Sequence, residues 1–303
     1  MARSALILVT RPCVDSTADT DREINSNRVL GTPFHTADPG SPQLNVLDFA
    51  ATRGDGIFES ISVIAGIPHA LDAHLSRFET SAAILDLPTP DRAIWRGAIA
   101  AALAELDNAP EAYIRAVLSR GIEGTGQPTG WVYAAPAPDY SRVRTEGVRV
   151  VLLDRGYPRN VESTSPWLLA GAKTLSYAVN RAALREAARR DADDVVFVSS
   201  DGYVLEGPTS SVLFLRGERL GTPGSGSGIL PGTTQDDVFQ WAASVGLSTG
   251  FENLTPAELR TTDAAWLVSS SRHAVPIISL DGAPHPVRWD ITTAINAFLL
   301  TGR

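Results

Sequence analysis

Lys173 stands in the segment AGAKTL (residues 170–175), between small residues on one side and a predicted apolar-striped helix on the other. Lysines are scarce in this arginine-rich chain. At such a position the side chain would be partly desolvated, which lowers the pKa of its ammonium group. A neutral amine can attack an aldehyde, so Lys173 is a candidate for covalent catalysis. Taken alone, a solvated lysine at a helix start is the commoner meaning of this pattern.

Glu206 is a second candidate for chemistry, because it ends a predicted hairpin strand directly before Gly207 and Pro208. A carboxylate that faces a pyridine nitrogen keeps that nitrogen protonated, and a protonated ring withdraws electrons more strongly. An acidic side chain at the end of a strand also serves solubility alone.

A candidate phosphate site lies where a Gly-rich loop runs into Thr233 and Thr234 at a predicted helix start. The first amides of a helix, its dipole and two hydroxyl groups together can bind an anion. A plain threonine N-cap is the commoner meaning. Arg77, on another predicted helix, could grip a phosphate with its planar fork or be an ordinary surface arginine.

Hydrophobic periodicity predicts the elements that would position these residues. Alternation over residues 58–64 predicts a strand, and Asp201-Gly202 predicts a hairpin turn. Helical spacing predicts a helix over 72–85, which carries Arg77, and another over 174–190, directly after Lys173. The other predicted strands cover 113–118, 131–135, 148–153, 195–199, 203–205, 211–215 and 264–269, and the other predicted helices cover 94–106, 235–244 and 291–300.

Composition restricts the class of protein. The chain has 303 residues, 44% of them hydrophobic and 20% charged, with a formal net charge of −8. This length suggests two domains or one large two-lobed unit, and this charge, without a basic block, argues against a nucleic-acid partner. No apolar run approaches membrane-spanning length, and the short apolar stretch near residue 1 predicts a strand. A single cysteine, Cys13, excludes an intramolecular disulfide and is typical of a cytoplasmic protein. Residues 14–45 are predicted to be loops around a short strand.

The order of the motifs is more specific than any one of them. GDGIFES, HLSRF, the lysine segment, LEGPTSS and LPGTTQ follow one another within residues 54–276. In this order they resemble the fold type IV pyridoxal-phosphate enzymes, the family of branched-chain aminotransferase, D-amino-acid aminotransferase and 4-amino-4-deoxychorismate lyase.

This resemblance implies a mixed α/β fold with two domains. Residues 1–140 would form a small N-terminal α/β domain, and residues 141–303 a larger domain with a barrel-like sheet that carries the cofactor lysine. The polar stretch 136–147, which contains two prolines, agrees with that division as a linker. The resemblance also implies a homodimer, with the cofactor between the two domains of each chain.

The resemblance assigns the cofactor, pyridoxal 5'-phosphate, to particular residues. Lys173 would bond covalently to it and then shuttle a proton, while Glu206 would pair with the pyridinium nitrogen. Tyr177 would bond the ring hydroxyl or be an ordinary buried tyrosine. The phosphate would be held by Arg77, Thr234, the amide of Thr233, and Ser270. A non-catalytic relative is disfavoured, because such a protein would have little reason to keep this set together.

Within the family the sequence favours a lyase that converts aminodeoxychorismate to 4-aminobenzoate and pyruvate. Phe58 stands where D-amino-acid aminotransferases tend to have tyrosine, and the segment 171–175 looks like the lysine segment of lyases. The chain also resembles actinobacterial aminodeoxychorismate lyase-like proteins. Transamination of D-amino or branched-chain amino acids remains the alternative, alone or as a second activity. Gln235 and Ser211 replace an arginine and an asparagine of many relatives.

Two arginines are candidates for binding a substrate carboxylate. Arg115 and Arg120 lie on or beside the strand predicted at 113–118, and their odd spacing puts them on opposite faces if that strand is regular. Arg120 resembles the carboxylate-binding arginine of D-amino-acid aminotransferases. Arg272 is a further candidate, and for each of the three a solvated arginine is the ordinary alternative.

Overall fold

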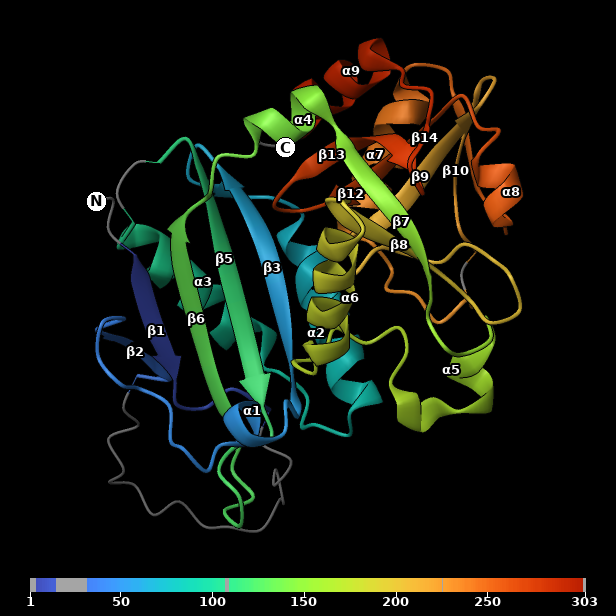
Figure 1. Cartoon of the computed structure of the whole chain (residues 1–303). Coiled ribbons are helices and arrows are strands. Elements are labelled where there is room, and N and C mark those ends of the chain that lie inside the picture. Colours follow the sequence, from blue (N-terminus) through green and yellow to red (C-terminus); the bar gives the residue numbers. More distant parts are fainter. Residues whose placement is uncertain (1–3, 15–31, 107–108, 225, 302–303) are drawn as a thin grey trace, which may run out of the picture. The chain divides into compact units, whose positions relative to one another are not determined.

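The computed structural model of the chain describes residues 4–14, 32–106, 109–224 and 226–301. Its contacts divide the chain into two compact units. Unit 1 comprises residues 1–66, 71–137 and 173–176, and unit 2 comprises residues 67–70, 138–172 and 177–303. Neither unit is one continuous stretch, because the chain passes from one to the other at five places. The predicted mixed α/β class is confirmed (Figure 1).

The first sheet has the strand order β2-β1-β6-β5-β3-β4. Its pairings β1–β2, β1–β6, β5–β6 and β3–β5 are all antiparallel. The apolar stretch near residue 1 is indeed a strand. Residues 15–31 of the region predicted as loops lie outside the described residues. The strands are β1 (Ala5–Val9), β2 (Phe34–Ala37), β3 (Gly56–Ile64), β4 (Ile67–Pro68), β5 (Glu111–Ser119) and β6 (Thr129–Pro136).

Two helices, α2 (Leu71–Ile84) and α3 (Arg92–Ala104), cover one face of this sheet (Figure 1). Alternate residues of β3 face them, so Ile57 and Ile61 are fully buried. Phe78 of α2 meets Trp95 of α3 edge to face, with ring centroids 4.9 Å apart. The short helix α1 (Phe49–Thr52) precedes β3.

The second sheet, in unit 2, has the order β11-β10-β9-β12-β13-β7-β8, with β14 paired to β13. The pairs β7–β8, β7–β13 and β10–β11 are parallel. Its strands are β7 (Val148–Asp154), β8 (Asp194–Val198), β9 (Ser211–Arg216), β10 (Arg219–Thr222), β11 (Ser248–Phe251), β12 (Ala264–Ser269), β13 (His273–Leu280) and β14 (Ala283–Pro284). The helical segments are α4 (Ser141–Glu146), α5 (Val161–Thr164), η1 (Pro166–Leu168), α6 (Ala178–Arg189), α7 (Thr233–Ser244), α8 (Pro256–Leu259) and α9 (Trp289–Leu299).

This second sheet curls around its own core. Val196 of β8 and Phe214 of β9 belong to one buried cluster, although three strands separate β8 from β9 in the sheet. The opposite face packs against α7 and α9 through a second cluster that includes Trp241, Trp266 and Ile295. The barrel-like sheet expected for the second half of the chain is therefore present.

The structure differs from the predicted elements around the lysine. The helix predicted over 174–190 begins only at Ala178, and residues 173–176 group with unit 1. Lys173 was expected in the larger C-terminal domain, but nonlocal pairing with β3 assigns it to the first unit. The contact boundary near the predicted linker falls between Ala137 and Pro138, and the linker itself contains α4. In the described part of the chain, no helix is long and apolar enough to cross a membrane.

Candidate active site

Lys173 is the only lysine in the sequence. Its backbone lies against the edge of β3 as a short extra strand. The Phe58 amide donates to the Lys173 carbonyl at 3.0 Å, and the Leu175 amide donates to the Gly56 carbonyl at 2.8 Å, around an antiparallel bridge between Ile57 and Thr174. Lys173 is therefore held by a strand edge, not by the helix start that its sequence predicts.

The Lys173 side chain lies over an aromatic ring of the same unit. Its Nζ atom is 4.4 Å from the centroid of the Phe58 ring. Because side chains alternate along a strand, Phe58 projects from the face of β3 opposite to Glu59. At this distance the amine and the ring are in contact range for a cation–π interaction. The small residues around Lys173 made it a candidate in the sequence. Its contact with Phe58 was not predictable in this way, because β3 lies more than a hundred residues earlier in the chain.

Three charged or titratable side chains meet on the helical face of β3. Both carboxylate oxygens of Glu59 accept from Arg77, from Nε at 2.8 Å and from Nη2 at 2.7 Å. Nδ1 of His74 lies 2.7 Å from Oε2 of the same carboxylate. Glu59 and His74 are almost fully buried, and the Arg77 side chain is 10% exposed. A fork-to-fork pair of this kind fixes the plane of the guanidinium.

Burial alone would raise the pKa of the Glu59 carboxyl, but Arg77 first and His74 second outweigh it and lower that pKa to about 2. Burial lowers the pKa of His74; the Glu59 carboxylate opposes this shift, whereas Arg77 and Lys173 support it. Arg77 was predicted to be a phosphate ligand, and Glu59 was not singled out. The sequence does contain a sign of this role. Glu59 falls on the same face of the alternating strand as Ile57 and Ile61, where an apolar residue is expected.

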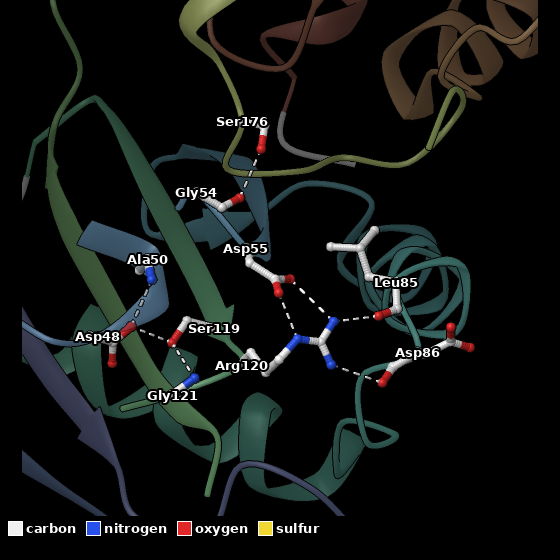
Figure 2. Close-up of polar contacts among 10 residues, drawn as sticks. All are labelled: Asp48, Ala50, Gly54, Asp55, Leu85, Asp86, Ser119, Arg120, Gly121 and Ser176. Atoms are coloured by element: carbon white, nitrogen blue, oxygen red, sulfur yellow. Dashed lines mark hydrogen bonds and ion pairs between the residues drawn. The ribbon is translucent and has the colours of Figure 1, made fainter. Parts of the chain in front are cut away.

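Arg120 makes four side-chain hydrogen bonds inside unit 1 (Figure 2). Its Nε and Nη2 atoms donate to the Asp55 carboxylate at 2.6 and 3.2 Å. Nη2 also donates to the Leu85 carbonyl at 2.7 Å, and Nη1 donates to the Asp86 carbonyl at 3.2 Å, just beyond the end of α2. A cation at a helix C-terminus satisfies carbonyls that the helix itself cannot.

The predicted alternation does not reach Arg120, because β5 ends at Ser119. Ser119 donates its hydroxyl proton to Asp48 at 2.7 Å, and the Gly121 amide donates to the Ser119 hydroxyl at 3.0 Å (Figure 2). The chain thus leaves the sheet in a fixed turn, and Arg120 points to α2. Binding of a substrate carboxylate by Arg120 stays a prediction. The contacts of Arg120 with Asp55 and with the end of α2 also stabilise the fold of unit 1.

The other two arginines have different surroundings. Arg115 lies within β5 with an exposed side chain, whose guanidinium carbon is 5.8 Å from the centroid of the Tyr113 ring. Arg272, in unit 2, donates to the buried Asp194 carboxylate at 2.7 Å and contacts the Thr209 hydroxyl at 3.5 Å. This ion pair ties the turn before β13 to β8.

Glu206 is positioned by backbone contacts in unit 2. Its carbonyl accepts from the Phe197 amide at 2.8 Å, which pairs the segment with β8. Its carboxylate Oε2 accepts from the Leu230 amide at 3.1 Å. The side chain is therefore held between β8 and the loop that leads into α7. The predicted hairpin turn at Asp201-Gly202 is present, with Val198 bridged to Val204.

The start of α7 has the features of an anion site. Thr233 and Thr234 are its first residues, and Gly232, which precedes them, brings no capping side chain to their amides. The Thr234 and Ser270 hydroxyls lie 3.3 Å apart. A Cβ atom at position 232 would lie 2.3 Å from the Ser211 hydroxyl oxygen, so a glycine suits this close approach. Tyr177 directly precedes α6 and is half-buried.

Each unit, taken by itself, carries groups of the kinds that bind part of a phosphorylated aromatic aldehyde. Unit 1 supplies an amine over an aromatic ring and an arginine held in plane by a buried carboxylate. Unit 2 supplies a glutamate fixed by a backbone amide, two neighbouring hydroxyls and a helix N-terminus. Among the described residues, no group of three or more His, Cys, Asp or Glu side chains could hold a metal ion.

Comparisons with known proteins agree with this chemistry. Residues 56–280 match the amino-transferase class IV family. A bifunctional aminodeoxychorismate lyase / D-amino acid transaminase from Mycobacterium tuberculosis is 44% identical over 260 residues, covering 82% of this chain and 89% of that protein. A fold IV-transaminase from Curtobacterium pusillum superposes with a TM-score of 0.90 at 49% identity, covering 98% of this chain and 97% of that chain. The PLP-bound form of a hypothetical aminotransferase from Mycobacterium tuberculosis gives 0.84 at 41% identity, covering 89% and 97%.

The chain therefore belongs to the amino-transferase class IV family, whose members have the fold type IV architecture predicted from the motif order. It is an enzyme that depends on pyridoxal 5'-phosphate.

Proposed function

We propose that this enzyme is a 4-amino-4-deoxychorismate lyase, releasing 4-aminobenzoate and pyruvate, with D-amino-acid transamination as a second activity. The observation that carries the proposal is the 44% identity, over 82% of this chain, to a relative described as bifunctional for these two reactions. Lys173, Glu206, Arg77 and Thr234, the residues that the family resemblance assigns to the cofactor, are all present in this chain.

Bound pyridoxal phosphate would supply an electron sink that stabilises negative charge on the substrate carbon next to the amine. Lys173 would hold the cofactor covalently and, once displaced by the substrate amine, would move a proton with Nζ. Glu206 would keep the ring nitrogen protonated, and its bond from the Leu230 amide orients the carboxylate for this task. Arg77 would bind the phosphate with a guanidinium that Glu59 holds in plane.

Arg115 is the better placed of the two predicted carboxylate ligands. Phe58, which lies under the Lys173 amine, and Ser60 project from the same face of β3. Arg115 of β5 is the register partner of Ser60. It is therefore a diagonal neighbour of Phe58, at about 7–8 Å between backbones, which a long side chain can bridge. A substrate whose amine reaches Lys173 could place a carboxylate against Arg115.

Transamination without lyase activity is the second candidate, favoured by the fold IV-transaminase that superposes at 49% identity. In both reactions Lys173 would give way to the substrate amine and would then accept a proton at Nζ. They differ in whether the substrate side chain departs as pyruvate, which the groups around the substrate decide and the lysine does not.

We propose a homodimer as the working assembly and the cytoplasm as its location, with no nucleic-acid or membrane partner. The family resemblance supports the dimer, and the single cysteine is compatible with a reducing compartment. Sedimentation of the cofactor-loaded protein at several concentrations tests the assembly, and a mass equal to one chain throughout would refute the dimer.

The decisive experiment has two parts. The purified protein should show a violet absorption band with added pyridoxal phosphate, and borohydride should fix the added mass to the Lys173 peptide. The loaded enzyme is then given aminodeoxychorismate, or D-alanine with 2-oxoglutarate. Release of 4-aminobenzoate supports the lyase, and D-alanine-dependent glutamate formation alone supports a transaminase. Absence of both products refutes the lyase and D-amino-acid transamination.

Arginine variants test the substrate contact. Arg115→Lys should raise KM by about tenfold or more, because a bidentate charge-assisted contact is lost. Arg120→Lys should change KM far less and lower stability instead. The reverse pattern would make Arg120 the carboxylate ligand.

A further inference from the structure

Ser81 makes a contact with Lys173 that the proposed chemistry has not yet used. The Lys173 backbone amide donates to the Ser81 hydroxyl oxygen at 3.1 Å. Ser81 is almost fully buried on α2, at 1% exposure. A buried hydroxyl that accepts from the amide of the only lysine is a specific arrangement, because buried amides need an acceptor and a strand edge ordinarily provides it.

The hydrogen bond from the Lys173 amide to Ser81 lies directly beside the pairing between β3 and the lysine segment. Around the bridge between Ile57 and Thr174, the Phe58 amide donates to the Lys173 carbonyl. In a continued antiparallel ladder, the Lys173 amide would return a bond to the Phe58 carbonyl, since such residues exchange both bonds. The Ser81 hydroxyl accepts from that amide, so α2 as well as β3 holds the backbone at Lys173.

Ser81 also links the lysine to the arginine of the phosphate site. Arg77 and Ser81 are four residues apart on α2, so they lie on one helical face, about 6 Å apart along the axis. Glu59 of β3 fixes the Arg77 guanidinium, and the amide of Phe58, the residue before it, donates to the Lys173 carbonyl. Helix α2 and strand β3 therefore fix both the backbone position of Lys173 and the plane of the Arg77 guanidinium.

We propose that Ser81 is a positioning residue for Lys173, fixing where its flexible side chain begins relative to Arg77. This inference rests on the proposed role of Lys173 as the covalent anchor. A lysine side chain has four rotatable methylene groups, so an anchor at its backbone narrows the volume that Nζ can explore. Misplacement of a reacting group by about 1 Å can slow a reaction on the order of 100-fold.

Ser81→Ala removes the acceptor and keeps a small buried side chain. Thr80→Ala is the matched control, because the Thr80 hydroxyl is exposed and donates only within its own helix, to the Ser76 carbonyl at 3.0 Å. Hydrogen exchange at the Lys173 amide is measured in the protein without cofactor. Ser81→Ala should accelerate this exchange roughly three- to tenfold, because one hydrogen bond is lost. Thr80→Ala should leave it unchanged.

The amine itself gives a second reading without cofactor. With a single lysine in the chain, acylation by a small reagent reports on Lys173 alone once the N-terminal peptide is separated. Ser81→Ala should shift the pH profile of this acylation. In the loaded enzyme it should lower kcat on the order of tenfold with little change in KM, and Ser81→Thr, which keeps the hydroxyl, should recover most of both properties.

Wild-type exchange, acylation and kcat in Ser81→Ala would overturn the proposal. A rise in exchange spread evenly over all of unit 1 would also overturn it, since that outcome signals a purely structural role. The exchange and acylation measurements need no substrate. A failed test of the lyase and transaminase activities therefore leaves them interpretable.

Discussion

The two units hold their candidate groups by different means. In unit 1, Arg77 is fixed by Glu59, a buried ion with a second titratable neighbour in His74. In unit 2, Glu206 is fixed by backbone pairing and one amide, and the proposed anion site consists of a glycine, two threonines and a serine. Buried charge thus fixes Arg77 in the first unit, while Glu206 and the start of α7 in the second unit rely on small residues and main-chain geometry.

This difference predicts how substitutions in each unit affect stability and cofactor binding. Removing one partner of a buried ion pair leaves an uncompensated charge, which costs far more than losing one neutral hydroxyl. Substitutions in unit 1 should therefore affect folding and chemistry together, whereas substitutions at the unit 2 anion site should affect cofactor affinity with little loss of stability.

The largest expected effect comes from Lys173→Ala. Turnover should fall on the order of 10³-fold or more, because the covalent anchor and the proton carrier are one group. The variant contains no lysine, so borohydride should fix no cofactor to any internal residue, as read by intact mass. Retained turnover, or a new labelled site with activity, would contradict the assigned role.

Glu59→Gln tests the buried charge of unit 1. It should lower the free energy of unfolding by about 3–5 kcal/mol, because Arg77 would keep its charge without a carboxylate partner. Urea unfolding measures the change. Glu79→Gln is the matched control: its pair with Arg92 is about one-third exposed, and its loss should lower the free energy of unfolding far less. Equal losses in the two variants would remove the distinction between the units.

The same carboxylate should give the protein an acid-sensitive stability. Because the pKa of Glu59 falls from 4.5 to about 2 on folding, the carboxylate stabilises the native state above pH 4.5, and this contribution is lost as the pH falls through 2. Unfolding free energies measured between pH 5 and 2 should decline more steeply in the wild type than in Glu59→Gln. Parallel curves would contradict the lowered pKa.

The smallest effect is expected at the hydroxyl pair of unit 2. Thr234→Ala should weaken cofactor binding by roughly three- to tenfold, the value of one hydrogen bond, with nearly unchanged unfolding of the protein without cofactor. Fluorescence titration with pyridoxal phosphate measures the affinity. Thr261→Ala, whose hydroxyl donates only to the nearby Glu258 carbonyl, serves as control. A loss of stability in Thr234→Ala as large as that in Glu59→Gln would contradict the difference between the two units.

The sequence predicted the elements that depend on local periodicity. The strand expected over 58–64 is β3, and the helix expected over 72–85 is α2, each within two residues. Thr233 and Thr234 were expected directly before the helix at 235–244 and form its first turn instead. Helical spacing and alternation are properties of short stretches, which is why these predictions succeed.

What the sequence could not predict depends on contacts between distant segments. The lysine segment lies on β3 because residues 56–58 accept and donate its backbone bonds, and nothing near Lys173 encodes that partner. Ser81 and Glu59 were overlooked for the same reason, although Glu59 breaks the apolar pattern of its strand. The predicted alternation of Arg115 and Arg120 does not apply, because β5 ends at Ser119, one residue before Arg120.

The repeated passage of the chain between the units has a consequence for how such enzymes can be recombined. A fragment that ends at Ala137 would lack residues 173–176, and so would lack the amine altogether. In a chimaera made from two relatives by one crossover at that boundary, β3 would come from one parent and the lysine segment that pairs with it from the other. Productive exchange would therefore need both segments from the same parent.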